Sequence, residues 1–273
     1  MKLKSLAFTL FATCGLLAAS AAQADKLDDI IKKGVIRCAV VLDFPPMGSR
    51  DSSNTPIGFD VDYCADLAKS LGVKHELVET PFPDRIPALM SGRADVIVGS
   101  TSDTMERAKT VGMSVPYFAF EMVVLTRTDA KIAKYEDLKG RPVGGPAGTY
   151  EAIALEADLK KWNNPKGKFH GYQSLADSVL ALSQGQIDGV VVTSTVASAL
   201  IKTGKYKNLK IAGKAPYDTD YVSLVAARNE FGMLNYLNLF INRQVRSGRY
   251  NELFTKWIGG TDAPALTAAG VYR

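Results

Sequence analysis

Two hydrophobic patterns alternate along the chain. Continuous apolar runs at 35–42 and 95–98 predict buried strands. Apolar residues three or four positions apart predict a helix over 59–70, with Asp60 as its N-cap and Gly72 beyond its end. Further segments give the order strand, helix, strand, helix and strand. This order is typical of a mostly parallel sheet with helices on both faces.

The same order of elements begins again after residue 139. Residues 89–100 also align with residues 182–193. In both segments a helix ends at a glycine, an aspartate opens an apolar strand and a hydroxyl residue closes it. The repeat predicts an α/β protein with two similar lobes. In the second lobe, strands are expected over 141–145, 169–172 and 188–192.

The hydroxyl residues of the repeat, Ser100 and Thr193, are expected to face each other across a cleft. Ligands of open parallel sheets bind beyond the carboxyl ends of the strands. A last strand and two helices follow the second unit, so we expect the chain to return to the first lobe. The predicted first lobe contains residues 25–119 and 218–273, and the second contains residues 120–217. Two crossings form a hinge that suits closure around a ligand.

The segment 99–107, with the sequence GSTSDTMER, is the strongest candidate for binding chemistry. It follows the strand at 95–98 and precedes a helix expected to begin near Thr104 and end near Thr110. Such a turn presents backbone N–H groups, serine hydroxyls, the positive end of a helix dipole and the Arg107 guanidinium. A carboxylate fits the planar fork of arginine with two hydrogen bonds. The pattern predicts capture of a small carboxylate between the lobes.

Residues 1–24 have the pattern of a secretory signal peptide. A basic start precedes an apolar stretch at 6–19, and Ala22-Gln23-Ala24 fits a cleavage site, so cleavage is expected after Ala24. The apolar stretch is shorter than the roughly 20 residues that span a bilayer, which disfavours a membrane anchor. Lipid modification of Cys14 is a weaker alternative.

Charge and cysteine content narrow the possibilities. The formal charge of +5 falls to +3 without the first 24 residues, and the absence of a long basic run disfavours nucleic-acid binding. The two remaining cysteines, Cys38 and Cys64, predict a disulfide in an oxidising compartment, with two buried thiols as the alternative. His75 and His170 are far apart in sequence, so neither a metal site nor a cofactor is expected.

A series of short motifs runs in the order found in one known family. The motifs are Lys33-Gly34-Val35-Ile36-Arg37, Phe44-Pro45-Pro46, Gly58-Phe59-Asp60-Val61-Asp62, Arg85-Ile86-Pro87-Ala88-Leu89, Ser91-Gly92-Arg93-Ala94-Asp95, Thr104-Met105-Glu106-Arg107, Ser114-Val115-Pro116-Tyr117, Asp137-Leu138-Lys139-Gly140, Ala147-Gly148-Thr149 and Gly185-Gln186-Ile187-Asp188. With these motifs, nearly the whole mature chain resembles the periplasmic solute-binding proteins of polar amino-acid ABC transporters, bacterial solute-binding protein family 3.

The resemblance implies a two-lobed periplasmic-binding-protein fold of type II. It implies a monomer in the periplasm that binds an amino acid or a related carboxylate and serves an inner-membrane ABC permease. It also implies roles for individual residues. Those matching the ligand-carboxylate site are Arg107, Ser100, Ser102 and Thr149, and those matching the apolar wall of the cleft are Phe44 and Phe82.

One position departs from the family pattern. Where the family commonly has an aspartate that binds the ligand ammonium, five residues after Asp188, this chain has Thr193. A threonine accepts a hydrogen bond but brings no charge. The candidate replacements are Glu151 and Asp220. Their simpler interpretations are a charge at a helix N-terminus for Glu151 and a solvated loop acid for Asp220.

Two classes of function are compatible with these residues. The first is a binding protein without covalent chemistry. The alternative is a cleft enzyme similar to cyclohexadienyl dehydratase, with Glu151 as general acid. The sequence contains no evident nucleophile, metal set or paired acid and base, so we expect a binding protein rather than an enzyme. A sensor lobe of a larger receptor is less well supported, because no linker or membrane segment is evident.

Overall fold

The structure is a computed structural model that describes residues 25–260, 263, 264 and 266. The predicted signal peptide and its cleavage site lie outside the described residues. Among the described helices, none has the length and apolar character to span a bilayer.

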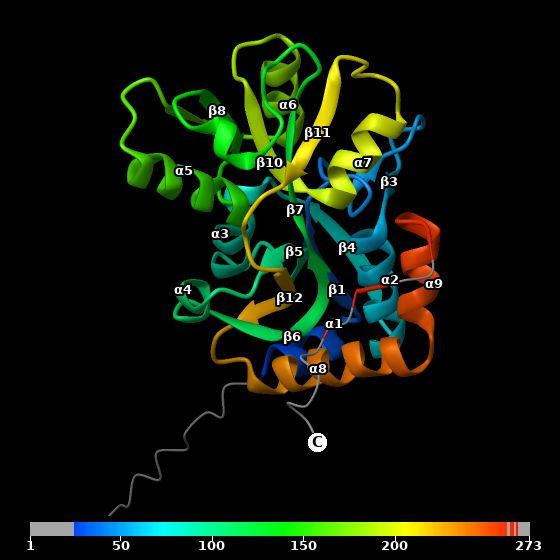
Figure 1. The fold of residues 1–273 in the computed structure, drawn as a ribbon. Coiled ribbons are helices and arrows are strands. Elements are labelled where there is room, and N and C mark those ends of the chain that lie inside the picture. Colours follow the sequence, from blue (N-terminus) through cyan, green and yellow to red (C-terminus); the bar gives the residue numbers. More distant parts are fainter. Residues whose placement is uncertain (1–24, 261–262, 265, 267–273) are drawn as a thin grey trace, which may run out of the picture.

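Two five-stranded sheets form the centres of two lobes, and the second lobe lies above the first in Figure 1. The first sheet has the order β4 (Lys74–Glu79), β1 (Val35–Val40), β5 (Val96–Ser102), β12 (Asp220–Ala227) and β6 (Val111–Phe120). The second has the order β11 (Leu209–Lys214), β7 (Met122–Arg127), β10 (Gly189–Thr193), β8 (Pro142–Pro146) and β9 (Lys168–Tyr172). A small ribbon, β2 (Ser49–Arg50) with β3 (Pro56–Ile57), extends the first lobe.

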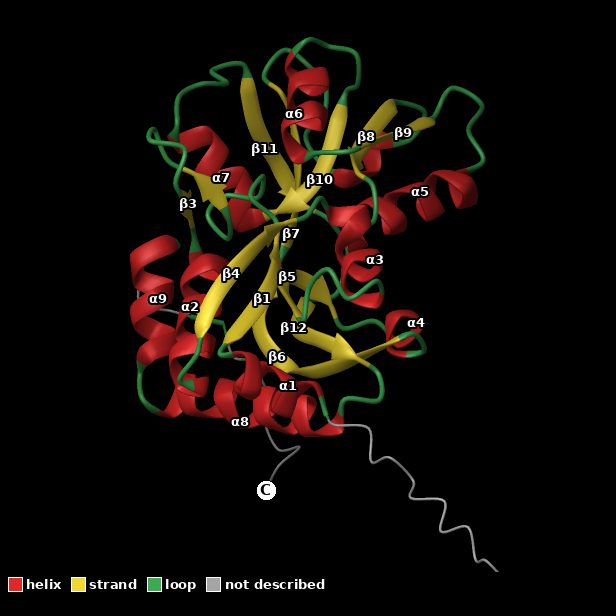
Figure 2. Cartoon of the chain, turned by 180° about the vertical axis from the view of Figure 1, so that it is seen from behind, coloured by secondary structure: helices red, strands yellow, loops and turns green. Residues whose placement is uncertain are grey.

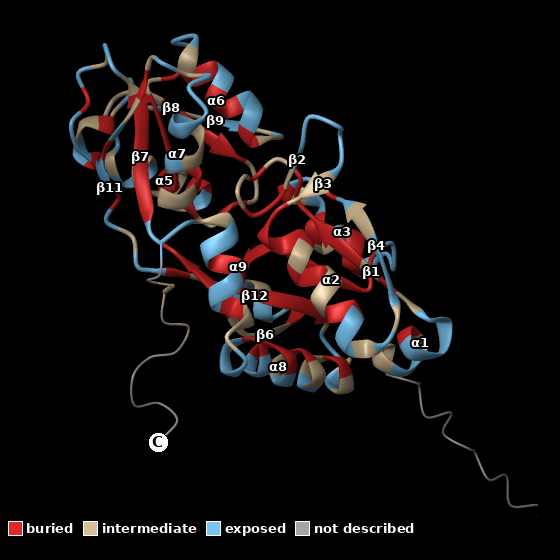
Figure 3. Cartoon of the chain, turned by 90° about the vertical axis from the view of Figure 1, so that its right-hand side faces the viewer, coloured by how far each residue is buried: buried red, intermediate tan, exposed pale blue. Residues whose placement is uncertain are grey.

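Helices cover both sheets (Figure 2). The central strands β5 and β10 are fully buried, whereas the edge strands β4, β9 and β11 are mostly exposed or partly buried (Figure 3). The helices of the first lobe are α1 (Lys26–Lys33), α2 (Phe59–Leu71), α3 (Arg85–Met90), α4 (Met105–Ala108), α8 (Phe231–Arg246) and α9 (Arg249–Trp257). Those of the second are α5 (Tyr150–Trp162), α6 (Leu175–Ser183) and α7 (Ser194–Lys202). Short 3-10 turns are η1 (Phe82–Asp84) and η2 (Tyr135–Leu138).

Each sheet is parallel except for one strand, β12 in the first and β7 in the second. These two strands follow the two passages of the chain between the sheets, at Glu121 and over residues 215–219. The two-lobed fold of mostly parallel sheets is therefore confirmed. Strands β6 and β11 were absent from the sequence prediction.

The predicted turn at 99–107 is shorter than expected. Strand β5 continues to Ser102, because Thr101 and Ser102 pair with Ser223 and Val222 of antiparallel β12. The register shifts in this region, and Ser100 has the left-handed φ of 47°. Helix α4 is a single turn of four residues rather than about two turns.

The predicted N-cap of α2 is also wrong. Gly58 occupies that position, with a φ of 138°. A Cβ added there would lie within 3 Å of backbone atoms of Met47, so only glycine fits. Asp60 lies inside the helix and is buried. The disulfide bond between Cys38 of β1 and Cys64 of α2 links this helix to the sheet.

The repeated aspartates have matching structural partners. Asp95 opens β5 and accepts hydrogen bonds from Arg37, whose Nη2 lies 2.7 Å from Asp95 Oδ1. Asp188 precedes β10, and its Oδ1 lies 3.0 Å from Nη2 of Arg127 on β7. In both lobes an arginine from a β-strand therefore holds the start of the central strand.

Candidate functional site

A small cavity lies between the lobes, at the carboxyl ends of β5 and β10. Both lobes contribute to its wall. The lining residues on the side of the first sheet are Phe44, Phe82, Arg85, Ser100, Ser102, Phe120 and Asp220, and those on the side of the second sheet are Thr149, Tyr150, Glu151 and Thr193. The structure thus gathers eight of the nine predicted site residues around one cavity, and Arg107 lies directly behind its wall.

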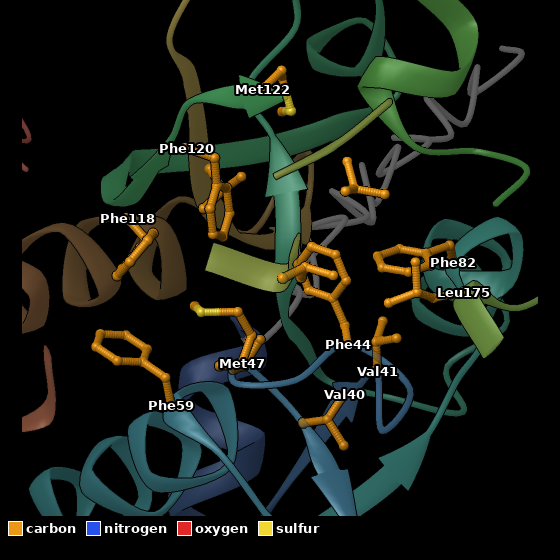
Figure 4. Packing of buried hydrophobic residues seen from close by; sticks show 14 of the residues in the cluster. Val40, Val41, Phe44, Met47, Phe59, Phe82, Phe118, Phe120, Met122 and Leu175 are labelled. Carbon is orange, nitrogen blue, oxygen red and sulfur yellow. The ribbon is translucent and has the colours of Figure 1, made fainter. Parts of the chain in front are cut away.

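Phenylalanine rings form the apolar side of the cavity. Phe44 follows β1, and its ring lies between those of Phe82 and Phe120 (Figure 4). The centroids are 5.0 Å apart for Phe44 and Phe82 and 6.0 Å apart for Phe44 and Phe120, both in edge-to-face geometry. Edge-to-face contacts are favourable for aromatic rings, so this wall is rigid.

Two arginines of the first lobe reach the same carbonyl group of the second lobe. Arg107 Nη2 donates to the Gly148 oxygen at 2.8 Å, and Arg85 Nη2 donates to it at 3.2 Å. Gly148 has a φ of 77° and lies so close to Pro83 that an added Cβ would be 3.1 Å from its Cα. The lobes are therefore in contact at this turn, and glycine permits the close approach.

Arg85 donates hydrogen bonds to five groups of the protein. Besides Gly148, it donates to the carbonyl oxygens of Phe82, Gly99 and Ser100 and to the Thr101 hydroxyl. Burial, followed by repulsion from Arg107, lowers the pKa of Arg85 to about 9, so this buried side chain remains charged near neutral pH. The sequence motif contained Arg85, but its position in the cavity was not predicted.

Arg107 has two protein partners. Its Nη1 donates to the Ser102 oxygen at 3.0 Å, and its Nη2 donates to Gly148. Since a guanidinium has five N–H donors, this arginine has further donors for a carboxylate. Burial lowers the pKa of Arg107, although the nearby Asp220 and Glu151 oppose that change.

Ser100 differs from the prediction in its partners. Its N–H donates to the Tyr117 hydroxyl at 2.9 Å, and its own hydroxyl donates to Asp60 Oδ2 at 3.0 Å. The Tyr117 hydroxyl donates to Asp60 Oδ1 at 2.7 Å. Both donors that were expected to bind the ligand are therefore engaged by buried neighbours. Burial raises the pKa of Asp60 to about 7, against the lowering effect of these hydrogen bonds.

Two carboxylates from opposite lobes face the cavity. Glu151 is in the first turn of α5, and Asp220 begins β12 and accepts a hydrogen bond of 3.1 Å from the Ser102 hydroxyl. Both are buried, so the interpretation of Asp220 as a solvated loop acid is wrong. Burial raises the pKa of Glu151, and burial together with the charge of Glu151 raises that of Asp220 to about 7.

The two threonines of the cavity act as helix caps. Thr149 Oγ1 accepts a hydrogen bond from the Ala152 N–H at the start of α5, and Thr193 Oγ1 accepts one from the Val196 N–H at the start of α7. Each bond is 3.3 Å long. Thr193 therefore has a structural partner inside its own lobe.

Sequence reasoning missed several residues of the site. Phe120 lies beside the predicted hinge, and Tyr150 directly precedes Glu151. Tyr117 and Asp60 lie in quoted motifs, but the hydrogen bond between them joins residues 57 positions apart. In the described part of the chain, no group of metal-ligating residues is present.

The fold and the cavity define a two-lobed binding protein with its site between the lobes. Residues 36–260 match the bacterial extracellular solute-binding proteins, family 3, and the chain belongs to this family.

Similar proteins agree with this assignment. The chain is 26% identical to a probable histidine-binding protein of Neisseria gonorrhoeae, over 82% of each chain. An ancestral arginine-binding protein bound to arginine has a TM-score of 0.78 and 29% identity, over 83% of this chain and 99% of that one. An ancestral amino acid-binding protein described as a precursor of cyclohexadienyl dehydratase has a TM-score of 0.75 and 29% identity, over 86% of this chain and all of that one.

Proposed function

We propose that this protein binds an amino acid or a related small carboxylate between its lobes and delivers it to an inner-membrane ABC permease. The observation that carries the proposal is one cavity lined by Arg85 and by a buried carboxylate from each lobe, with Arg107 bonded to the carbonyl oxygen of the lining residue Ser102. A zwitterion needs a cationic partner for its carboxylate and an anionic partner for its ammonium. The relatives of this chain include proteins named for binding histidine and arginine. The ligand-binding form is the periplasmic monomer left after cleavage behind Ala24.

The charges assign the two ends of the ligand. The α-carboxylate binds Arg107 through donors that the protein leaves available, with Ser102 and Thr149 beside it. The ammonium binds Asp220 and Glu151, which replace the acid missing at Thr193.

The hinge is formed where the chain passes between the lobes. The first lobe comprises residues 25–119 and 218–273, and the second comprises residues 120–217. Closure brings Gly148 onto Arg107 and brings the α6 N-terminus onto Asp43, whose Oδ2 accepts a 3.1 Å hydrogen bond from Ala176. Two hydrogen bonds therefore join the lobes in the closed conformation, one at Gly148 and one at Ala176.

A thermal-shift screen tests the proposal. The mature protein is heated with each of the twenty standard L-amino acids, opines and small dicarboxylates. A compound at about 1,000 times its Kd adds about 4 kcal/mol to the free energy of unfolding, which such a screen detects. Calorimetric titration then measures Kd. If no compound raises Tm or gives a binding isotherm, the proposal is wrong.

A second candidate function rests on Glu151. This buried acid has a raised pKa, as a general acid requires, and one similar structure is described as a precursor of a dehydratase. Incubation with prephenate or arogenate tests it. Turnover that is lost in Glu151→Gln would favour an enzyme, whereas the binding proposal expects no turnover by either protein.

A further inference from the structure

Glu151 and Asp220 form a carboxylate pair to which each lobe contributes one member. Glu151 is on α5 of the second lobe and Asp220 is on β12 of the first, and both side chains line the same cavity. They are 4% and 8% exposed, so little water reaches either one. Two carboxylates in one dry site repel each other, and such a pair retains a proton until a cation arrives.

The neighbouring arginines contact other groups and not this pair of carboxylates. In the described part of the chain, neither carboxylate forms a salt bridge. The guanidinium of Arg85, on α3, is directed at carbonyl groups and the Thr101 hydroxyl. That of Arg107, on α4, is directed at the Ser102 and Gly148 carbonyl groups. Both arginines favour ionisation of the pair at a distance, but neither neutralises it by contact.

Other charged and titratable groups also act on the pair. Asp103, after β5, adds negative charge near Asp220. Tyr150 and Asp218 belong to the same electrostatic environment, since Asp220, Asp218 and Glu151 all raise the pKa of Tyr150. These groups bring no positive charge. The pair therefore lacks a direct cationic partner while the cavity holds no ligand.

We infer that the ligand ammonium takes the place of a proton held between Glu151 and Asp220, so that ligand and proton compete for one position. The inference rests on the proposed function and adds the chemistry of one subsite. That subsite takes the ammonium group of the ligand. On binding, the carboxyl O–H bond breaks and its proton passes to water or buffer. The ammonium then donates hydrogen bonds to both carboxylates. The lobes can close on a cation or on a proton, but not on two bare carboxylates.

The competition has a definite sign. As the pH falls, the pair becomes protonated, while a free amino acid keeps its ammonium and its carboxylate near neutral pH. The Kd is therefore expected to rise on acidification, with a slope that approaches about tenfold per pH unit below the apparent pKa of the pair. Above that pKa the slope vanishes.

Calorimetry in paired buffers tests the inference directly. The probe is the standard L-amino acid with the largest thermal shift, titrated at about pH 6 and about pH 8 in two buffers of different ionisation enthalpy. The difference between buffers gives the number of protons released. We expect a value approaching one at the lower pH and approaching zero at the higher pH.

Variants locate the proton. Asp220→Asn and Glu151→Gln each leave one carboxylate, so both should bind more weakly and lose most of the proton release. Glu136→Gln, at an exposed acid of η2, is the matched control and should behave as the parent protein. Asp60, whose pKa is also raised, is the competing source of a proton. Release that persists in both cavity variants would place the proton there and overturn the inference.

The failure of the inference is distinguishable from the failure of the proposed function. Binding with one Kd between about pH 5.5 and 8 and no proton release would overturn the inference and leave the amino-acid site intact. If only a carboxylate without an ammonium group binds, the inference alone is wrong. If none of the screened compounds binds, both are wrong.

Discussion

The two strand-to-helix junctions at the cavity begin alike and end differently. In the first lobe, β5 continues through Ser100 and Ser102 before Thr104 caps α4, which carries Arg107. In the second lobe, β10 ends at Thr193, and that residue is itself the cap of α7. The first junction therefore presents a charged group to the cleft, whereas the second presents a hydroxyl that its own helix uses.

The shared part of the junctions is the part that stabilises the fold. Asp95 and Asp188 are each held by an arginine of a strand, Arg37 or Arg127. The ligand-facing parts have diverged. The negative charge of the second lobe comes instead from Glu151, at the junction of β8 and α5. Similarity between lobes thus follows structural need, while binding chemistry follows the position of individual side chains.

The largest effect is expected at the charged junction. Arg107→Ala removes the guanidinium proposed to bind the carboxylate and the contact to Gly148. Loss of one partner from a buried charge pair costs about 2–5 kcal/mol, or at least about 30-fold in Kd. Calorimetry measures the Kd, and circular dichroism checks that the fold is retained. Arg93→Ala, at an exposed arginine of the same lobe, is the control and should leave the Kd unchanged. Equal Kd values for the two variants would refute the carboxylate assignment.

The next effect tests the acid that replaces Thr193. Asp220→Asn keeps the shape but removes the charge, and a charge-assisted hydrogen bond contributes about 1.5–3 kcal/mol. We expect affinity for the amino acid to fall by roughly 10- to 100-fold, measured by calorimetry at about pH 8. An unchanged Kd would mean that the ammonium lies elsewhere.

The same variant is expected to stabilise the protein without ligand. The pKa of Asp220 is raised to about 7 in the folded state, above the value of roughly 3.9 in an unfolded chain. The folded state therefore binds more protons between about pH 4 and 7, and its stability falls as the pH rises through this range. At about pH 8, Asp220→Asn should raise Tm by about 2–4 °C, which corresponds to roughly 1 kcal/mol for a chain of this size. A lower Tm would contradict this account.

The shared part of the junctions is tested by a matched pair of changes. Arg37→Ala and Arg127→Ala each remove the strand arginine that is hydrogen-bonded to the aspartate, while Lys26 remains 3.8 Å from Asp95 and Arg141 remains 3.5 Å from Asp188. Each should lower the free energy of unfolding by roughly 1–3 kcal/mol, measured with denaturant, and should leave the Kd of the amino acid unchanged. A loss of stability in only one variant would show that the repeat in sequence is not a repeat in energetics.

Much of this architecture could be predicted from the sequence. The apolar runs identified the centres of β1, β5 and β10, and the glycine–aspartate repeat identified equivalent places in the two lobes. The strands that were missed have weak patterns. Strand β6 contains Gly112 and Pro116, and the six residues of β11 include two lysines and Gly213. Their pairing partners, which the sequence does not display, define them as strands.

The candidate site was predictable in its members but not in their partners. Ser100 follows an apolar run and looks free to bind a ligand, yet its two donors are used by Tyr117 and Asp60. Arg85 donates to carbonyl groups that only the folded backbone brings together. Hydrogen bonds between distant segments decide which polar groups remain available, and a local pattern does not contain them.

The smallest effect separates the two junctions most sharply, because it applies one chemical change to both. Thr104→Val and Thr193→Val remove the cap hydroxyls of α4 and α7, and each should cost about 1 kcal/mol of unfolding free energy. Their effects on Kd should differ. The cap of α4 holds the single turn that carries Arg107, so Thr104→Val should weaken binding by a factor of about 2–5. Thr193→Val should change the Kd by less than about twofold, since Asp220 and Glu151 supply the charge. Calorimetry and denaturant unfolding of both variants measure these values. A tenfold loss of affinity in Thr193→Val, about 1.4 kcal/mol, would make its hydroxyl a direct ligand contact and restore the symmetry between the lobes.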